Sequence, residues 1–562
     1  MVPERAFDRD ARSMALTMPP PTAWDGLRGM AREGVLPKFG GVMDSDWSQG
    51  YVTEVLYTEH FFRELSPAWL NYVAVLNGCQ PRALDPGFTY MELGCGLGQT
   101  VTLLAGAHPQ GRFFGVDFNP AHVDWARRYA AQAGIGNVEF LERSFLDLSA
   151  QEVPECDFIV LHGVYAWVSP EVRRGIQRII RERLKPGGIV YNSYNCLPGW
   201  AADGPLQKLI FETSKHLSGD ATQRTQGALK SVEELVGAKF AYFAATPTAG
   251  KMAAKMSERN ANYLAHEFLN EHWTPFYSSD VADEMANAKL TFVGSATLAE
   301  NHLELLGGDD LQAKVKAQPS QRLRQLFQDL AQNQRFRRDV FVRGHAQLNR
   351  AGIVRNMDGQ VFGALRDLKN VTNVAKVARG EVKFDEKAFP ALKEALQQGT
   401  WSVGELRKEM VAKKLAHLDV ERTLTLLAAT GIAVPSAVAS RPAPMPAAQK
   451  QIKIPLATNR ALVKRMVDNL TPGNVVSTLA GNALTVDPIF GVILSQGAQP
   501  WKDKDELKER LMGEVKRRRI RFSKPAKEEK PLDDAGRATQ FFDRFWADEA
   551  PVLHRLGVIE FG

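Results

Sequence analysis

An α/β fold, in which helices cover both faces of a mostly parallel sheet, is the fold class that this sequence of 562 residues predicts. Short apolar segments alternate with segments of helical spacing between residues 90 and 194. The first apolar segment ends in a loop with three glycines, Gly94, Gly96 and Gly98, and the second ends on Asp117, 19 residues after Gly98. Ligands of such folds bind at the carboxyl ends of the strands, so the glycine loop and Asp117 mark a candidate nucleoside site.

The elements follow in a regular order. A strand ends at the glycine loop, a helix follows, and a second strand closes on Asp117. The spacing of Val123, Ala126 and Tyr129 predicts a helix over residues 120–133, and Gly134 is typical of a helix end. Further strands are predicted over 138–141, 156–163 and 189–194, with a helix over 170–184 and a turn over 185–188.

The glycine spacing distinguishes between nucleoside ligands. A dinucleotide site uses the pattern G-x-G-x-x-G, because a helix start must face a pyrophosphate. Here the pattern is E-x-G-x-G-x-G, and Gln99 stands where the dinucleotide pattern requires its third glycine. The carboxylate of Glu92 would repel phosphate but suits the neighbourhood of a cationic sulfonium. The loop therefore favours S-adenosylmethionine.

Four motifs in this order resemble the class I S-adenosylmethionine-dependent methyltransferases: residues 92–98, 115–117, 156–160 and 184–188. Four further segments are similar to bacterial methyltransferases that carry a methyltransferase regulatory domain: residues 195–200, 263–269, 290–296 and 336–343. The characterised members of that group are protein-lysine methyltransferases. The resemblance implies a Rossmann-like seven-stranded methyltransferase sheet, S-adenosyl-L-methionine as cofactor, and methyl transfer to lysine side chains of a protein substrate. A small-molecule O- or N-methyltransferase and a non-catalytic, cofactor-bound scaffold or regulator are the alternatives.

Composition and breaker residues divide the chain into five predicted parts. They are an N-terminal segment (1–50), a class I methyltransferase domain (51–345) with a helical insertion at about 201–275, a winged-helix-like module (346–440), a Pro/Ala linker (441–458) and a mostly helical C-terminal domain (459–562). A helical pattern from Tyr51 to Gly78 predicts a leading helix, which in methyltransferases commonly covers the cofactor. Residues 290–293 are expected to form a sixth strand, and residues 338–343 a seventh, antiparallel strand at the sheet edge.

The chemistry of methyl transfer limits the catalytic candidates. It is an in-line displacement that an enzyme accelerates mainly by alignment in a water-poor site. Two aromatic rings after the fourth strand could form a cage for a methylammonium group, and a second group of side chains ends the fifth strand. Ordinary packing is the alternative for each, and Tyr191 is assigned to the core. The predicted catalytic residues are His162, Tyr165, Trp167, Tyr194 and Asn195.

The cofactor contacts follow from the motifs. The glycine backbone is expected near the amino acid moiety, Asp117 at the ribose hydroxyls, and Phe118 against adenine. Ser144 stands where family members place an acidic residue against the adenine amine, so one contact departs from the family pattern, and Asp147 is a possible replacement. The predicted cofactor-binding residues are Glu92, Gly94, Gly96, Gly98, Asp117, Phe118, Ser144, Phe145 and His162.

Composition also bears on partners and compartment. The net charge of +6, from 70 basic and 64 acidic residues, predicts no nucleic-acid-binding field. The four cysteines form no C-x-x-C pair, which is typical of a reducing compartment.

Residues 1–24 lack the apolar core of a signal peptide, and no stretch has the roughly 20 apolar residues of a membrane helix, so we expect a cytoplasmic protein without membrane insertion. His266 and His272 are six residues apart rather than four, so no metal site is predicted. The oligomeric state is left open.

Two basic groups leave a nucleic-acid alternative open. Arg407, Lys408, Lys413 and Lys414 of the winged-helix-like module could contact DNA phosphates. Acidic residues are interleaved with them, which favours a packing or protein-interaction module. The basic run at residues 516–521 is interpreted in the same way, as a solvated helix face.

Overall fold

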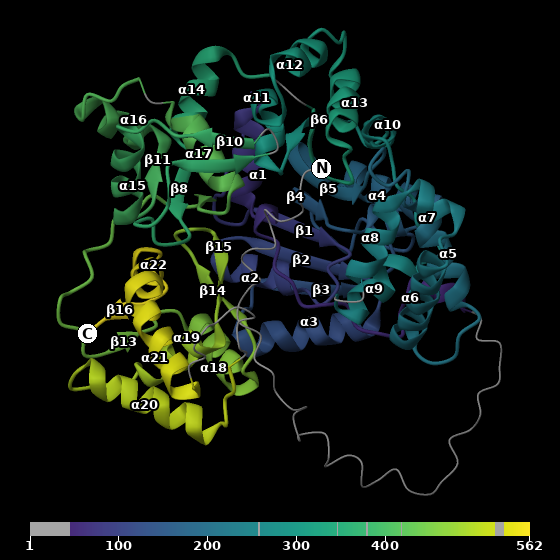
Figure 1. The fold of residues 1–562 in the computed structure, drawn as a ribbon. Coiled ribbons are helices and arrows are strands. Elements are labelled where there is room, and N and C mark those ends of the chain that lie inside the picture. Colours follow the sequence, from purple (N-terminus) through teal and green to yellow (C-terminus); the bar gives the residue numbers. More distant parts are fainter. Residues whose placement is uncertain (1–44, 257–258, 345–346, 378–379, 418, 523–532) are drawn as a thin grey trace, which may run out of the picture.

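A seven-stranded sheet lies at the centre of the molecule (Figure 1). The computed structural model describes residues 45–256, 259–344, 347–377, 380–417, 419–522 and 533–562. The strand order is β3-β2-β1-β4-β5-β7-β6, and the first five strands pair in parallel. This confirms the predicted Rossmann-like sheet. The strands are β1 (Thr89–Leu93), β2 (Arg112–Asp117), β3 (Val138–Glu142), β4 (Cys156–Leu161), β5 (Leu184–Asn195), β6 (Leu290–Ser295) and β7 (Phe336–Arg343).

The position of β7 corrects one prediction. This strand is antiparallel, as expected, but it lies between β5 and β6 and not at the sheet edge. Its residues Val340, Phe341 and Val342 are buried, so the strand needs neighbours on both sides. The strand at this edge of the sheet is β6, whose Thr291 is exposed, and β3 lies at the other edge. Strand order within a sheet is a tertiary property that the apolar pattern of a single strand does not contain.

Helices cover both faces of the sheet. α1 (Pro67–Leu76), α2 (Gln99–Ala107) and α3 (Pro120–Ala133) pack with one face, and α4 (Pro170–Arg183) and α10 (Ser278–Ala286) pack with the other. The limits of α3 are those predicted. Asn119 caps its first turn by accepting a hydrogen bond from Ala121 N at 2.9 Å, and Gly134 ends it with φ of 66°.

The predicted leading helix is shorter than expected. Only Pro67–Leu76 is α-helical, because Ser66 caps the helix and Pro67 occupies its first turn. The indole nitrogen of Trp69 donates to Ala296 O at 2.9 Å, which fixes α1 beside the end of β6. The helix therefore lies away from the glycine loop and does not cover it.

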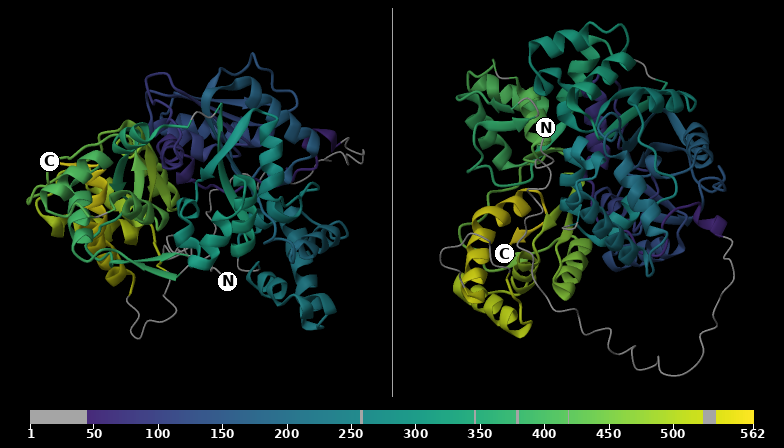
Figure 2. Two further views of the ribbon diagram at one scale, coloured as in Figure 1. Left: turned by 90° about the horizontal axis from the view of Figure 1, so that it is seen from above. Right: turned by 45° about the vertical axis from the view of Figure 1, so that its right-hand side comes forward.

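The predicted helical insertion follows β5 and is confirmed. Its helices share a core of their own, which contains Leu206, Val232 and Phe268 (Figures 1 and 2). They are α5 (Gly204–Ser214), α6 (Ala221–Gly237), α7 (Ala241–Ala245), α8 (Pro247–Met256) and α9 (Ala261–Phe268). The chain returns to the sheet through α10, β6, α11 (Leu303–Leu306), α12 (Asp309–Lys316), α13 (Gln321–Gln332) and β7.

The module after the sheet contains α14 (Arg350–Asp358), followed by a winged-helix-like group of three helices and a small sheet. The last of these helices, α17 (Val420–Ala429), packs toward α1, and the hydroxyls of Tyr72 and Thr425 lie 2.6 Å apart. Arg407 pairs with Asp358 and Glu421. These contacts favour the packing interpretation over DNA binding. The elements are α14 (Arg350–Asp358), β8 (Val361–Ala364), β9 (Val374–Val377), β10 (Gly380–Lys383), α15 (Ala388–Gln398), β11 (Trp401–Ser402), α16 (Val403–Ala412), α17 (Val420–Ala429) and β12 (Ala433–Ser436), with a sheet of order β11-β8-β12.

The C-terminal region is mostly helical, as predicted, and contains one β-hairpin. The hairpin packs against α2, and α18 packs against α3 (Figure 1). Arg517 and Arg518 of the basic run both pair with Glu514, which agrees with a solvated helix face. The elements are β13 (Ile452–Lys453), α18 (Ala457–Asn469), β14 (Gly473–Ser477), β15 (Asn482–Val486), α19 (Pro488–Gln496), α20 (Lys504–Arg517), α21 (Asp534–Arg544), α22 (Ala550–Arg555) and β16 (Glu560–Phe561).

In the ranges that the structure describes, no helix combines the length and the apolar character needed to cross a lipid bilayer. The domain limits given above stay predictions, and residues 1–44 of the predicted N-terminal segment lie outside the described residues.

Candidate active site

The glycine loop between β1 and α2 is built on three left-handed residues. Gly94, Gly96 and Gly98 have φ of 72°, 52° and 65°. A Cβ atom on Gly94 would lie 2.5 Å from the Val164 side chain. A Cβ atom on Gly96 would meet only the Tyr57 ring, at 3.9 Å. The loop therefore lets the segment after β4 approach closely, and it leaves space above Gly96 for a ligand.

Replacing Gly98 with alanine is expected to lower the free energy of unfolding by about 2–4 kcal/mol. The new Cβ atom would lie 2.6 Å from the Phe140 ring and 2.7 Å from Ala126, in a conformation that L side chains rarely adopt. Urea denaturation measures the loss. Gly136→Ala is the control, because no atom lies within 4 Å of its Cβ position. Equal stability of the two variants would contradict the packing described for Gly98.

Two carboxylates meet this loop from the ends of β1 and β2. Asp117 accepts hydrogen bonds from Gly96 N at 2.8 Å and from Asn119 N at 2.9 Å. Glu92 is 4% exposed and accepts from the backbone of Val101 in the first turn of α2, while its Oε2 has no partner among the described residues. Burial raises the pKa of Glu92 to about 8. An unpartnered carboxylate oxygen beside an open glycine backbone fits the ammonium and sulfonium charges of S-adenosylmethionine.

The predicted adenine contacts lie further along the same edge of the sheet. The Phe118 ring is 6.0 Å from that of Trp47 and 5.8 Å from that of Tyr51. The Ser144 hydroxyl accepts from Gln49 Nε2 at 2.8 Å. The Phe145 ring is buried in the core on the α4 side. The structure therefore brings Phe118 and Ser144 to the strand ends, and their contacts with adenine stay predictions.

Residues 47–62, the strap, cross the carboxyl ends of the strands. Tyr57 N donates to His122 Nε2 at 3.5 Å, and Phe62 N donates to Thr100 Oγ1 at 3.2 Å. The strap thus runs from α3 to the start of α2, and Tyr57 lies over Gly96 of the glycine loop. Its residues 51–62 belong to the segment whose helical pattern predicts a leading helix that covers the cofactor. The segment does cover the glycine loop, but it contains no α-helix before Pro67.

The C-terminal region supports the strap and the loop from outside. Arg465 of α18 pairs with Glu59 of the strap at 3.1 Å. Gln99, the residue after the glycine loop, donates through Nε2 to Asn474 Oδ1 at 3.3 Å. Segments far apart in the sequence therefore hold together the edge of the sheet that carries the glycine loop, which we call the cofactor edge.

His162 lies beside the glycine loop at the end of β4. Its Nδ1 is 2.8 Å from the Tyr191 hydroxyl, and its ring stacks on Phe62 with centroids 3.7 Å apart. Burial, with smaller contributions from Arg338 and His60, lowers the pKa of His162 well below its ordinary value. His162 is therefore neutral, and Tyr191, which we had assigned to the core, is its partner.

Two predicted catalytic tyrosines lie in the core. Tyr165 is fully buried and donates its hydroxyl to Glu284 of α10. Tyr194 is fully buried and donates to Asp339 of β7 at 2.5 Å. Side chains alternate along a strand, so Tyr194 points to the face opposite Tyr191. Both hydroxyls are bonded within the core, which favours the packing alternative, and a catalytic role for either tyrosine stays a prediction.

Trp167 lies in the same core cluster as these tyrosines. Its ring comes within 3.4 Å of the Cβ position of Gly163. With Tyr165 turned toward α10, the two rings do not form the predicted cage. A catalytic role for Trp167 stays a prediction.

Asn195 keeps its predicted place at the end of β5, where it meets a residue that the sequence did not single out. Its Nδ2 donates to Glu267 Oε1 of α9 at 3.2 Å. Glu267 is 6% exposed, and burial raises its pKa to about 7. Glu267 lies within residues 263–269, one of the segments that resemble methyltransferases with a regulatory domain, but it is not among the predicted site residues.

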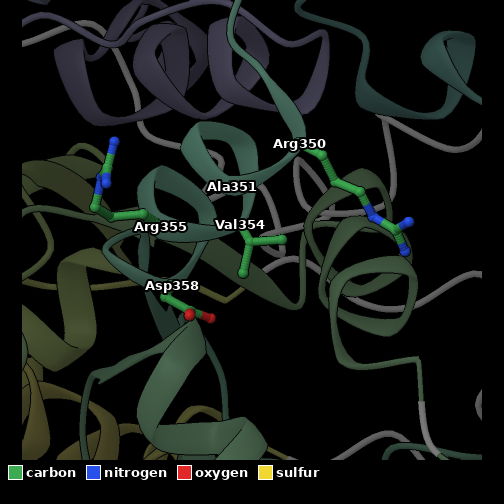
Figure 3. A pocket seen from close by; sticks show the side chains of 5 residues that line it. All are labelled: Arg350, Ala351, Val354, Arg355 and Asp358. Atoms are coloured by element: carbon green, nitrogen blue, oxygen red, sulfur yellow. The ribbon is translucent and has the colours of Figure 1, made fainter.

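A groove of about 630 Å³ lies elsewhere, along α14. Arg350, Ala351, Val354, Arg355 and Asp358 line it, and Figure 3 shows Arg350 and Arg355 pointing apart on either side of Val354. No glycine-loop residue lines this groove, so it is separate from the strand ends.

Comparison with known proteins agrees with this geometry. A family model described as a methyltransferase domain matches residues 91–188, and one described as a predicted methyltransferase regulatory domain matches residues 260–343. An uncharacterized protein of Synechocystis is 37% identical over 394 residues, which cover 69% of this chain and 77% of that protein. An uncharacterized protein of Rickettsia prowazekii is 31% identical over 229 residues, or 40% of this chain and 89% of that protein.

A solved structure shares the fold over most of the chain. PKMT2 from Rickettsia typhi, in complex with AdoHcy, superposes with a TM-score of 0.66 at 19% identity, covering 90% of this chain and 100% of that chain. With the glycine loop and Asp117, the match to the methyltransferase domain identifies S-adenosyl-L-methionine as the cofactor and methyl transfer as the activity. This chain belongs to the class I S-adenosylmethionine-dependent methyltransferases that carry a methyltransferase regulatory domain.

Proposed function

We propose that this methyltransferase transfers methyl groups to lysine side chains of a protein substrate. The observation that carries the proposal is the extent of the likeness to PKMT2, which covers 90% of this chain and so reaches beyond the sheet and its helices. The characterised members of the group that the sequence resembles are protein-lysine methyltransferases. The insertion and the C-terminal modules offer a surface far larger than a small molecule requires, and we propose that they recruit the polypeptide.

The residues at the strand ends have distinct roles in this proposal. Bound S-adenosylmethionine supplies a methyl group on a positively charged sulfur. The glycine backbone and Glu92 hold its amino acid part, and Asp117 holds the ribose. The strap excludes water, which strengthens every electrostatic contact in the site. His162, neutral and fixed by Tyr191, lines the side that faces the acceptor.

Label transfer tests this function. Purified full-length protein is incubated with methyl-labelled cofactor and a bacterial lysate, and the products are separated by size. Label on a protein band, located on lysine by mass spectrometry of its peptides, is the expected result. Label confined to the small-molecule fraction would instead support a small-molecule O- or N-methyltransferase. Cofactor binding without any label transfer would support a scaffold or regulator.

A further inference from the structure

Glu267 is a buried carboxylate whose hydrogen-bonding neighbours, the side chains of Asn195, Tyr263 and Trp273, are neutral. Asn195 Nδ2 donates to it at 3.2 Å, and the Tyr263 hydroxyl, one turn earlier on α9, donates at 3.4 Å. Arg259 makes the smallest of the contributions to its pKa, and its guanidinium lies 6.0 Å from the Tyr263 ring. Burying a carboxylate without a close cation is costly, so such a residue is typical of a site that receives a cation from outside.

Three tyrosines from two segments lie near this carboxylate. The charge of Glu267 contributes to the raised pKa values of Tyr51, Tyr57 and Tyr263, and it is the largest cause for Tyr263. Tyr51 and Tyr57 both pack on His266, with ring centroids 5.4 Å and 5.1 Å from the histidine. Ring faces attract ammonium and methylammonium groups, and a carboxylate among them adds a full negative charge.

This group of side chains lies next to the cofactor loop. Tyr57 comes within 3.9 Å of the Cβ position of Gly96. The charge of Asp117 also contributes to the raised pKa of Tyr51, so Tyr51 faces both acids. Asn195 ends β5, beside β4, whose end carries His162. The carboxylate, the rings and the glycine loop therefore share one edge of the sheet.

We propose that Glu267, Asn195, Tyr51, Tyr57 and Tyr263 form the subsite that binds the ammonium group of the acceptor, and that the Glu267 carboxylate takes its proton. The proposal rests on the proposed function and assigns a direct substrate role to the segment matched by the regulatory-domain model, residues 260–343. A neutral acceptor, such as a hydroxyl, would leave the carboxylate without the cation that stabilises it.

The proton and electron balance is simple. One N–H bond of the ammonium breaks, its electron pair stays on nitrogen, and the proton moves to a carboxylate oxygen of Glu267. The freed lone pair bonds to the methyl carbon while the carbon–sulfur bond breaks and its electrons stay on sulfur. The product is a methylammonium, which again suits the rings. Once the Glu267 carboxyl has released its proton to water and a new S-adenosylmethionine has replaced S-adenosylhomocysteine, the same lysine can lose another proton to Glu267 and accept a second methyl group.

Glu267→Gln tests the proposal in the full chain, with Glu233→Gln on the exposed face of α6 as control. The variant should bind S-adenosylhomocysteine like the wild type, as measured by calorimetry, but methylate lysine about 100-fold or more slowly. The titratable groups around Glu267 are Tyr51, Tyr57 and Tyr263, which are neutral, and the charged group is Arg259. Because burial raises the pKa of Glu267 to about 7, the wild-type rate should rise with pH through about 7. Glu267→Gln should lose this rise near pH 7. Its rate should increase only near the pKa of free lysine, about 10.4, where the amine loses its proton without help.

A binding measurement does not depend on the natural substrate. With S-adenosylhomocysteine present, the wild type should bind n-butylammonium, a mimic of the lysine side chain, and Glu267→Gln should not. If Glu267→Gln does not fold, Glu267→Asp is measured in its place. This variant should bind n-butylammonium, and its methylation rate should be lower than that of the wild type but should still rise with pH near 7. An unchanged rate and pH profile in either variant would overturn the proposal.

The outcomes separate this proposal from the proposed function. If the wild type labels protein lysines and Glu267→Gln does so equally well, the subsite is wrong and the function stands. If the wild type labels only small amines, and Glu267→Gln abolishes this, the subsite stands and the protein substrate is wrong. Label on oxygen or carbon in place of nitrogen would overturn the subsite.

Discussion

Replacing Asp117 with alanine is expected to raise the dissociation constant for S-adenosylhomocysteine by about 100-fold or more. Two ribose hydroxyls would lose a charged acceptor, and each such hydrogen bond contributes about 1.5–3 kcal/mol. Asp117 also accepts from the backbone nitrogens of Gly96 and Asn119, so its removal leaves the glycine loop less well fixed. Isothermal titration calorimetry on the purified full chain measures the change.

Two variants serve as controls for this expectation. Asp124→Ala removes an exposed acid from α3 that pairs with Arg128, and its affinity should equal that of the wild type. Asp117→Asn keeps the size of the side chain and can still accept one hydrogen bond, so its affinity for S-adenosylhomocysteine should fall between that of the wild type and that of Asp117→Ala. Wild-type affinity in Asp117→Ala would remove this residue from the cofactor site.

Replacing Arg337 with methionine is expected to lower the free energy of unfolding by about 3–5 kcal/mol. Arg337 is 3% exposed and pairs with Asp329 and Asp339, and Tyr194 donates to the same Asp339. Without the guanidinium, two buried carboxylates face each other with no cation. Urea denaturation at neutral pH measures the loss, and Arg174→Met on the exposed face of α4 should cost less than about 1 kcal/mol.

The loss in Arg337→Met should depend on pH. Burial already raises the pKa of Asp339 to about 6, above its ordinary value of 3.8. A carboxyl whose folded pKa is raised contributes stability below its unfolded pKa and loses it as the pH rises through the folded pKa. The variant lacks the cation that holds this pKa down, so its deficit should be largest above pH 7 and should shrink toward pH 4. A deficit independent of pH would contradict this account of the buried cluster.

The sequence predicted the sheet well because strands buried on both faces have continuous apolar runs and defined ends. The order of β7 and β6 could not be predicted, since it depends on how strands meet across the sheet. Tyr194 and Asn195 were predicted together at the end of β5, although neighbouring side chains of a strand point to opposite faces. Which face carries the glycine loop's partners is evident only in three dimensions, from contacts such as that between Tyr191 and His162.

Cofactor residues were easier to predict than acceptor residues. The glycines and Asp117 follow strands directly, so local sequence determines their place. Glu267 lies in a helix 72 residues after Asn195, and only the return of α9 to the sheet brings the two together. A cover over the cofactor was expected from residues 51–78, but its helical form was wrong for residues 51–62, because their structure depends on contacts with α2, α3 and α9 and not on a pattern of their own.

The contact between Arg465 and Glu59 has a consequence for the order of events on the ribosome. The two residues are 406 positions apart, so at about 5–20 residues per second the strap is synthesised roughly 20–80 s before its arginine partner. The hydrogen bond from Gln99 to Asn474 likewise forms only after Asn474 has been synthesised. A nascent chain can pair its central strands early, but the cover of the cofactor edge is secured only when the C-terminal hairpin has emerged.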